Sequence, residues 1–212
     1  MFANGEANDG PMVQRALALA HEPLIIVADG GARVAAHYGF SVQTVIGDMD
    51  SLATQELVAL SDAGAQVLRY PAEKDETDLE LALKLAAARG ATWIRIIGGV
   101  GNRLDQTLSN IYLMALPELT RCDARLVAGN QEMWLLPPGE HLIDGAVGDT
   151  ISLLPLNGEV QGITTEALHY PLRGETLAFG PARGISNVLT AAQARVTVRR
   201  GILLCVHTLG RA

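Results

Sequence analysis

The chain has few cysteines, no long apolar run and no excess of positive charge, and each shortage excludes a class of protein. No apolar run reaches the roughly 18 residues that a helix needs to cross a bilayer, so we expect no membrane partner. The N-terminal residues lack the features of a secretory signal. Cys122 and Cys205 lie far apart and outside metal-binding spacings, so we expect reduced thiols and a cytoplasmic location. The formal net charge of −7 disfavours a nucleic-acid partner, whose phosphates need basic surface.

Residues 1–136 alternate short apolar runs with segments of helical periodicity. The apolar runs lie at residues 24–28, 44–46, 66–70, 93–97, 125–128 and 133–136, and the helical segments lie at 32–39, 54–64, 78–90 and 103–115. The third helix is the best specified, because Thr77 and Glu80 form a capping box and Gly90 ends the periodic pattern. Alternating strands and helices predict an α/β fold with a mainly parallel sheet and helices on both faces.

The pattern changes after Pro137 and Pro138. Helical periodicity is lost, and short β-type runs recur between turns that contain glycine. These runs lie at residues 149–156, 159–165, 175–180, 194–201 and 202–208. Closely spaced strands of this kind predict a smaller, all-β antiparallel sandwich or barrel. We therefore expect two domains packed together, residues 1–136 and residues 137–212.

Aspartates follow four of the expected strands. Asp29 comes after the first run, Asp48 and Asp50 after the second, Asp78 beyond the third and Asp105 beyond the fourth. Because the carboxyl ends of parallel strands meet at one edge of a sheet, we expect these side chains to converge there. Clustered carboxylates repel one another unless a cation neutralises them, and oxygen ligands without His or Cys favour Mg²⁺. The sequence therefore predicts a magnesium site and, with it, a phosphate ligand.

Glycines accompany the same strand ends. Gly30 and Gly31 follow the first run, and Gly99 lies in the glycine-rich segment 98–101 after the fourth. Glycine at such positions lets backbone N–H groups approach a phosphate beside a helix N-terminus. Neither segment is a complete Walker A or dinucleotide-binding motif, and each glycine pair taken alone is typical of a tight turn. Arg103 adds a cation suited to bidentate contact with phosphate.

Each aspartate also has a local explanation. Asp29 could cap the helix that follows it, Asp50 could cap a nearby turn, and Asp78 could stabilise the first turn of its helix. Asp105 could form a salt bridge with a nearby arginine. A shared metal site explains all of these residues at one edge of one sheet, and we favour it.

Several motifs resemble those of the thiamine pyrophosphokinase family, in order and over nearly the full chain. They are "ADGGA", "IGDMDS", "KDETDLELAL" and "GGVGNRLDQTLSNIYLM", followed by "SLLPL", "LHYPL" and "GISN". The resemblance implies transfer of the diphosphoryl group of ATP to the thiamine hydroxyl, giving thiamine diphosphate and AMP. It also implies Mg²⁺ dependence, a Rossmann-like α/β domain, a β-sandwich domain, and a homodimer whose sites form where these domains of different subunits meet.

The resemblance also implies roles for individual residues. The implied catalytic residues are Asp48, Asp50, Asp78, Asp105 and Arg103, and the four aspartates among them are the implied metal ligands. The implied ATP-binding residues are Asp29, Gly30, Gly31, Thr77, Gly99, Arg103 and Gln106, and the implied thiamine-binding residues are Tyr170, Ser186 and Asn187. Residues 1–136 would thus bind ATP and Mg²⁺, and residues 137–212 would bind thiamine.

The chain departs from the family pattern at three places. Gln106 stands where many members have histidine, so a general base is not expected there, and Asp78 or Asp105 is the alternative proton acceptor. Val188 follows "GISN" where glutamate is often found, which puts a charged contact in doubt. The first strand, expected before "ANGE", is almost absent, so either it is very short or the chain starts late.

Two other functions fit parts of the pattern. "DMDS" after a strand resembles the nucleophile loop of haloacid-dehalogenase-like phosphatases, in which Asp48 would form an aspartyl-phosphate. That alternative leaves "GGVGNRLDQ" unexplained and expects a later lysine, whereas the chain has only Lys74 and Lys84. A non-enzymatic sensor would bind nucleotide and thiamine without releasing AMP.

Overall fold

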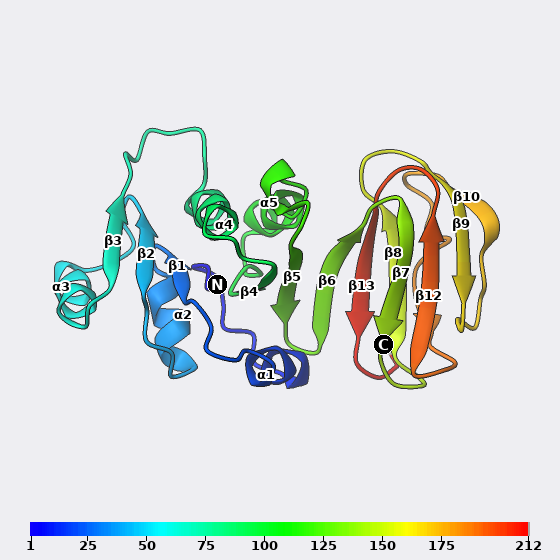
Figure 1. Cartoon of the computed structure of the whole chain (residues 1–212), viewed down its shortest axis with the longest axis horizontal. Helices are drawn as coiled ribbons and strands as arrows, with labels where there is room; N and C mark the ends of the chain where they lie inside the picture. The colour runs from blue at the N-terminus through cyan, green and yellow to red at the C-terminus, as the bar shows by residue number, and fades with distance from the viewer. Residues whose placement is uncertain (212) are drawn as a thin grey trace. The chain divides into compact units, whose positions relative to one another are not determined.

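The computed structural model describes residues 1–211, which fall into two compact units that divide between Gly129 and Asn130. Figure 1 shows the order of the elements along the chain. Strand β6 (Gln131–Leu136) belongs to the second unit, because it pairs along its whole length with β13 (Leu203–Thr208). The division therefore comes before Pro137, where the sequence predicts the junction.

The first unit contains strands that pair in parallel. They are β1 (Ile26–Ala28), β2 (Thr44–Gly47), β3 (Gln66–Arg69), β4 (Trp93–Ile97) and β5 (Asp123–Ala128). Strand β2 lies between β1 and β3, and β4 pairs with β5. Every residue of β1 and β2 is buried, which is the pattern of parallel strands covered on both faces. Each strand lies at an apolar run from which the sequence predicts one.

Helices connect these strands. They are α1 (Pro11–Ala18), α2 (Gly31–His37), α3 (Thr54–Asp62), α4 (Asp78–Ala88) and α5 (Leu104–Leu113), with the 3₁₀ helix η1 (Pro117–Leu119) after α5. Helix α4 packs on β1 and β2, whereas α2 packs on β1 and α1 on β5. In Figure 1, α4 and α5 lie above β1, β4 and β5, and α1 and α2 lie below them.

Helix α4 begins where the sequence predicts. The hydroxyl of Thr77 accepts a hydrogen bond from the backbone N–H of Glu80 at 3.2 Å, which confirms this half of the capping box. Leu79 and Leu83 are buried, and α4 packs on β1 and β2. Because this hydrogen bond fixes the first turn of α4, it also fixes the direction in which the Asp78 side chain projects from the helix.

The first residues of the chain complete the strand arrangement with a single pairing residue. Phe2 forms parallel bridges with Val27 of β1 and with Ile97 of β4. Its backbone N–H donates to the carbonyl of Ile26 at 3.1 Å, and its carbonyl accepts from the N–H of Ala28 at 2.9 Å. The strand expected before "ANGE" is represented by the single bridge residue Phe2, and the segment after Phe2 continues to the C-terminal ends of β1 and β4.

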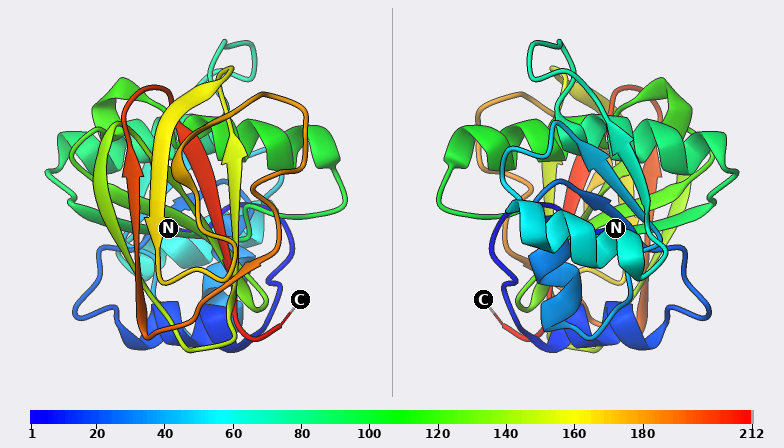
Figure 2. Two further views of the ribbon diagram at one scale, coloured as in Figure 1. Left: turned by 90° about the vertical axis from the view of Figure 1, so that its right-hand side faces the viewer. Right: turned by 90° about the vertical axis from the view of Figure 1, so that its left-hand side faces the viewer.

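The second unit consists of two antiparallel sheets. Besides β6 and β13, its strands are β7 (Gly139–Asp144), β8 (Thr150–Pro155), β9 (Val160–Glu166), β10 (Arg173–Leu177), β11 (Asn187–Val188) and β12 (Gln193–Val198). One sheet has the order β10-β9-β12-β7, and the strands of the other in this unit follow the order β11-β8-β13-β6. Figure 2 (left) shows the yellow and orange strands of the first sheet in front of the red β13.

Both sheets of the second unit contribute to one core. Strand β12 buries every second residue, and its Val196 and Val198 share this core with Ile151 of β8 and Cys205 of β13. A core shared by two antiparallel sheets is the arrangement of a β-sandwich, which the closely spaced strands predict. Both cysteines are thiols, as expected. Within residues 1–211, none of the helices has the length and apolar character that a membrane span requires.

Candidate active site

Three aspartates from separate segments of the first unit converge. Asp29 follows β1, Asp48 follows β2, and Asp78 begins α4, and one carboxylate oxygen of each lies within 4.8 Å of the others. Unit charges about 4 Å apart repel by roughly 4 kcal/mol at an effective dielectric constant near 20. The convergence that the sequence predicts for these three residues is therefore present, and it concentrates negative charge at the strand ends.

The cluster has the properties of a site for a hard cation. Asp29 is only 3% exposed, and its Oδ1 has no hydrogen-bond partner among residues 1–211, while its Oδ2 accepts from the N–H of Ser51 at 3.1 Å. Burial of a carboxylate oxygen without a partner is costly. Since the converging ligands are carboxylates, without histidine or cysteine, they suit Mg²⁺ better than zinc or copper.

The charges of the cluster affect Asp78 directly. Burial is the largest effect and raises the pKa of Asp78, and the nearby charges of Asp48 and Asp29 raise it further, against an opposing effect of Lys74. The ammonium of Lys74 lies 3.1 Å from Oδ1 of Asp78. A divalent cation at the cluster would favour the ionised form of all three carboxylates.

The backbone around the cluster adopts left-handed conformations that residues other than glycine seldom adopt. Asp29 has φ +42°, and Met49, between the two aspartates of "DMDS", has φ +68°. Gly47 has φ +150°, and a Cβ there would lie 2.8 Å from Cγ of Asp78, so only glycine lets Asp78 come this close. Such strain is typical of sites where function requires a fixed geometry.

The loop that carries Asp48 is held by two charged residues. Arg33 of α2 pairs with Glu56 of α3 through two contacts of 2.7 Å, and its guanidinium also donates to the carbonyl of Ser51 at 2.7 Å. Glu56 accepts from the N–H of Ala53 at 2.7 Å. The bonds from Arg33 and Ala53 lower the pKa of Glu56 to about 2. The Arg33–Glu56 pair, called the brace below, therefore holds the loop at Ser51 and at Ala53.

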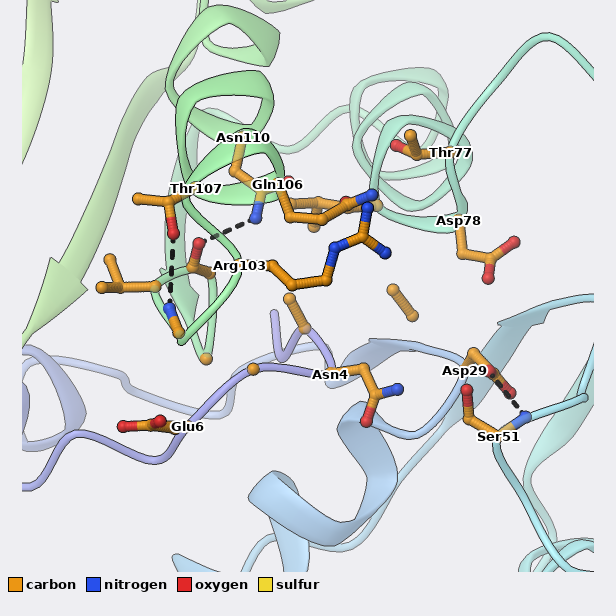
Figure 3. A pocket seen from close by; sticks show the side chains of 18 of the residues that line it. Asn4, Glu6, Asp29, Ser51, Thr77, Asp78, Arg103, Gln106, Thr107 and Asn110 are labelled. Atoms are coloured by element: carbon orange, nitrogen blue, oxygen red, sulfur yellow. Dashed lines mark hydrogen bonds between the residues drawn. The ribbon is translucent and has the colours of Figure 1, made fainter.

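A cavity of about 650 Å³ opens beside the cluster. Figure 3 shows side chains from the N-terminal segment, the aspartate loops and α5 around it. Two hydrogen bonds shape its glycine-rich wall: the amide of Asn110 donates to the carbonyl of Gly99 at 2.7 Å, and the N–H of Gly101 donates to Thr107 at 3.3 Å. The volume lies within the usual range for small-molecule sites. A phosphate-bearing ligand could therefore contact the carboxylates through a metal and the glycine-rich segment directly.

Most of the residues predicted to bind nucleotide or metal in the first unit line this cavity. Besides Asp29, Asp48 and Asp78, they are Asp50, Thr77, Gly99, Arg103 and Gln106. Asp50 is exposed, its N–H donates to Oδ1 of Asp48 at 3.1 Å, and its carboxylate accepts from Ser51 at 3.1 Å. The structure thus brings these residues together around one cavity.

Asp105 is not part of the three-aspartate cluster and does not line the cavity. It is exposed and pairs with Arg103, with nitrogen–oxygen distances of 2.5 and 3.2 Å. This pair lowers the pKa of Asp105 and raises that of Arg103. The local alternative, a salt bridge to a nearby arginine, is what the structure shows for this residue.

Gly30 and Gly31 do not line the cavity either. An added Cβ on Gly30 would collide with the side chain of Asn4, and one on Gly31 would collide with the backbone of Phe2. The glycines therefore let the N-terminal segment pass close to the β1–α2 turn, which is a packing reason for them that the sequence alone does not reveal.

In the second unit, the three residues predicted to bind the vitamin lie together. Tyr170 and Ser186 line a pocket of about 200 Å³ with Thr150, His169, Val188 and Arg211. The Asn187 side chain is buried and holds the backbone of Tyr170, accepting from its N–H at 2.9 Å and donating to its carbonyl at 2.7 Å. Tyr170 itself is exposed, with the His169 ring against it edge-on at 4.6 Å. Asn187 thus positions Tyr170 rather than facing the pocket.

Comparisons with known proteins identify the family. The model of the thiamin pyrophosphokinase catalytic domain matches residues 16–126, and that of the thiamin pyrophosphokinase vitamin B1 binding domain matches residues 140–203. The chain belongs to the thiamine pyrophosphokinase family. The reaction of this family is transfer of a diphosphoryl group from ATP to thiamine.

Individual thiamine pyrophosphokinases agree with this assignment. The curated enzyme of Bacillus subtilis is 31% identical over 186 residues, which cover 87% of each chain. The crystal structure of a Bacillus subtilis thiamine pyrophosphokinase superposes with a TM-score of 0.85 at 28% identity and covers 98% of this chain and 96% of that one. The Candida albicans structure has a TM-score of 0.81 at 16% identity, with coverage of 98% and 87%, and shows likeness of fold alone.

The two domain matches separate the candidate residues into the same two groups as the two pockets: those at the aspartate cluster and those around Tyr170. The catalytic-domain match contains the aspartate cluster and α5, and the vitamin-binding match contains Tyr170, Ser186 and Asn187. Several cavity residues were not predicted from the sequence, namely Asn4, Glu6, Ser51, Lys74, Thr107 and Asn110. For Asn4 and Glu6 the available signal was the "ANGE" segment, and for Lys74 it was a lone cation in an acidic stretch.

Proposed function

We propose that this chain transfers the diphosphoryl group of ATP to the hydroxyl of thiamine, giving thiamine diphosphate and AMP. The observation that carries the proposal is the convergence of Asp29, Asp48 and Asp78 within 4.8 Å beside a cavity with a glycine-rich wall. Three carboxylates that repel one another need a cation, and a cation at a cavity of nucleotide size suits a triphosphate.

The residues of the cluster fit Mg²⁺. Asp29, Asp48 and Asp78 would hold it, with Asp50 and Asp105 as further candidate ligands. Bound Mg²⁺ offsets negative charge on the phosphate oxygens and orients them. The unpartnered Oδ1 of Asp29 supports this assignment most directly, since a metal would supply the missing partner.

The remaining cavity residues would position ATP. Backbone N–H groups near Gly99 would approach the phosphates, and Arg103 would leave Asp105 to contact them through its guanidinium. Thr77 and Gln106 would add hydrogen bonds, and Gly30 and Gly31 would act indirectly, because they let the N-terminal segment pass close to the β1–α2 turn. These contacts hold the β-phosphorus where an incoming oxygen reaches it, which is most of what phosphoryl transfer requires from a protein.

In the reaction, the thiamine hydroxyl oxygen forms a bond to the β-phosphorus, and the bond to the oxygen shared with the α-phosphate breaks. AMP leaves with that oxygen. Of the two aspartates considered as proton acceptors, Asp105 is held by Arg103 outside the cavity, so Asp78 is the better placed. Its carboxylate would take the hydroxyl proton as the new bond forms.

The vitamin would bind at the second unit. Tyr170 offers an exposed ring that can stack on a thiamine ring, and Ser186 lies beside it with a strained φ of +58°. Asn187 supports Tyr170 through its backbone. The positive thiazolium would also be attracted by the negative charge of the aspartate cluster.

We further infer that two copies of the chain form the working enzyme. Helix α5 presents a stripe of exposed apolar side chains, Leu104, Leu108 and Tyr112, spaced four residues apart. On the same helix, Gln106 and Asn110 line the cavity. Gln106 and Asn110 lie about 200° round the helix from Leu104 and Leu108, so the cavity and the stripe use different faces of α5. The exposed apolar stripe is therefore available to a second copy of the chain.

The remaining parts of the proposal concern architecture and location. The parallel pairings of the first unit support a Rossmann-like arrangement. The cavity and the small pocket support a nucleotide-binding first domain and a thiamine-binding second domain. The thiol state of both cysteines supports a cytoplasmic location.

Product analysis tests the proposed reaction. The protein is incubated with ATP, Mg²⁺ and thiamine, and the products are separated by chromatography. AMP and thiamine diphosphate in equal amounts are expected. ADP with thiamine monophosphate would show attack at the γ-phosphorus, and binding of both substrates without AMP release would indicate a sensor; either result would contradict the proposal.

A further inference from the structure

Lys74 reaches into the aspartate cluster from the loop between β3 and α4. Its Nζ lies 3.1 Å from Oδ1 of Asp78 and 3.9 Å from Oδ2 of Asp48, and it donates to the carbonyl of Pro71 at 3.1 Å. The Lys74 side chain is 11% exposed, compared with 33% for Lys84, the other lysine of the chain. Lys74 is therefore held inside the site rather than on the surface.

The ammonium group neutralises only part of the cluster. It contacts Asp48 and Asp78, while the buried Oδ1 of Asp29 keeps no hydrogen-bond partner among residues 1–211. Three carboxylates and one ammonium leave a net charge of −2, whereas a divalent cation in place of the ammonium would leave −1. Lys74 therefore stabilises the cluster, but a divalent cation at the same oxygens would neutralise more of its charge.

We propose that Lys74 is a built-in counterion, which a divalent cation displaces from Asp48 and Asp78. The inference rests on the proposed function only in taking the cluster as a metal site. A metal ion and an ammonium group at the same carboxylate oxygens repel each other, so they compete for the cluster. The flexible stem of Lys74 lets its ammonium turn to the cavity, which this residue also lines. There the charge would face the phosphates of the nucleotide.

If Lys74 competes with the metal for the carboxylates, its removal should change the metal affinity in the opposite direction from removal of a residue that supports metal binding. Removal of a residue that helps to hold the metal weakens binding, whereas removal of a competing cation strengthens it. Mn²⁺ binding to the free protein, followed by the electron paramagnetic resonance signal of unbound Mn²⁺, measures this without catalysis. Lys74→Met should bind Mn²⁺ at least about tenfold more tightly than the wild type.

Conservative variants of Lys74 distinguish an effect of lost charge on Mn²⁺ binding from an effect of misfolding. Lys74→Arg keeps the positive charge and should bind Mn²⁺ within about threefold of the wild type. Lys74→Gln keeps a polar head without charge and should show the same gain as Lys74→Met, so misfolding of one variant does not decide the result. Adding Asp48→Asn to Lys74→Met should cancel the gain, because the metal then loses a ligand.

Lys84→Met is the matched control. Lys84 pairs with Glu80 at 2.7 Å and with Glu76 at 3.5 Å, and it does not line the cavity, so its removal should leave Mn²⁺ binding unchanged. Equal or weaker binding by Lys74→Met, including no detectable binding by any variant, would overturn the proposal. If Lys74→Met binds Mn²⁺ more tightly but the wild-type protein makes no thiamine diphosphate, the counterion role of Lys74 is supported and the proposed reaction is contradicted.

Discussion

Asp29 combines properties that seldom coincide in a residue with a purely structural role. Its side chain is buried, one of its carboxylate oxygens has no hydrogen-bond partner among residues 1–211, and its backbone has φ +42°. Each property costs free energy in a folded chain. These costs are offset if a ligand binds there, so Asp29 is the residue whose environment most strongly indicates a bound cation.

Asp48 gives the sharpest prediction for a single residue. We expect Asp48→Asn to lower turnover at least about 100-fold, because one strong contact to the charged transition state is lost. The same change at Asp50 should act in the same direction. Steady-state kinetics with ATP, Mg²⁺ and thiamine measure the effect. Thermal stability should not fall, since the substitution relieves repulsion within the cluster.

Asp62→Asn is the control for Asp48→Asn. Asp62 is exposed at the end of α3 and does not line the cavity, so the substitution should leave turnover unchanged. If turnover of Asp48→Asn stays within a few-fold of the wild type, Asp48 does not hold the metal.

At the scale of elements, the loop after β2 depends on the helices on either side of it. Arg33 of α2 and Glu56 of α3 pair with each other and hydrogen-bond to the backbone of that loop, at Ser51 and Ala53. Neither Arg33 nor Glu56 lines the cavity. The lowered pKa of Glu56, about 2, means that this pairing is complete above the ordinary pKa of 4.5 and is lost only as the pH falls toward 2. The loop is therefore held throughout the range in which the enzyme would be assayed.

Arg33→Ala should lower kcat by about tenfold, because Asp48 is no longer held against Asp29 and Asp78. The apparent affinity for Mg²⁺ in the kinetic assay should fall in parallel. Arg183→Ala is the matched control: Arg183 pairs with Glu175 at similar exposure, 52% and 38% compared with 54% and 36% for Arg33 and Glu56. Equal effects of the two substitutions would show that the brace has no special role.

The elements differ in how well the sequence predicts them. Apolar runs and the Thr77 cap predict the strands and α4, because burial and capping leave local signals. Strand β7 leaves no such signal, since most of its residues are exposed, and β11 has only two residues. Helix α1 is short and follows a polar segment, so its few buried residues do not produce a clear periodic pattern.

The candidate site is predictable to a similar extent. The convergence of Asp29, Asp48 and Asp78 follows from their places after parallel strands. The separate position of Asp105 does not follow, because its pairing with Arg103 depends on side-chain geometry at the start of α5. The approach of Lys74 depends on the path of an irregular loop, which sequence periodicity does not describe.

At the scale of the whole molecule, the second unit contains a buried charged group apart from the pocket. His207 of β13 is fully buried, with Asp149 at 2.8 Å and Glu132 of β6 at 3.7 Å. Asp149 also accepts from the N–H groups of Ala146 and Gly210. Burial lowers the pKa of His207, but Glu132 and Asp149 outweigh it, so the pKa is raised. The pKa of Asp149 is lowered by its hydrogen bonds despite burial.

His207→Gln should lower the free energy of unfolding by about 3 kcal/mol near pH 6, because Asp149 loses its charged partner in a buried position. The contribution of His207 is complete below its ordinary pKa of 6.5 and is lost as the pH rises through its raised pKa. That of Asp149 is complete above 3.8 and is lost as the pH falls through its lowered pKa. Urea unfolding should show the difference between wild type and variant shrinking above neutral pH; a constant difference would contradict this account.

The proposed homodimer gives a prediction about mass and activity together. Leu108→Glu combined with Tyr112→Glu should shift the protein from dimer to monomer in sedimentation velocity, because two charges would be buried in the interface. Activity should fall with the dimer fraction. Val58→Glu is the control, since Val58 on α3 is as exposed as Leu108, at 53%. A double variant that stays dimeric and active would show that α5 does not form the interface.

The central claim is that the three aspartates together hold a divalent cation that grips the phosphates of ATP. Crystals grown with Mn²⁺ and a non-hydrolysable ATP analogue test it most directly through the anomalous signal of the metal. We predict a Mn²⁺ peak within bonding distance of carboxylate oxygens of Asp29, Asp48 and Asp78 and of phosphate oxygens of the analogue. A nucleotide bound with its metal away from these carboxylates would contradict the account.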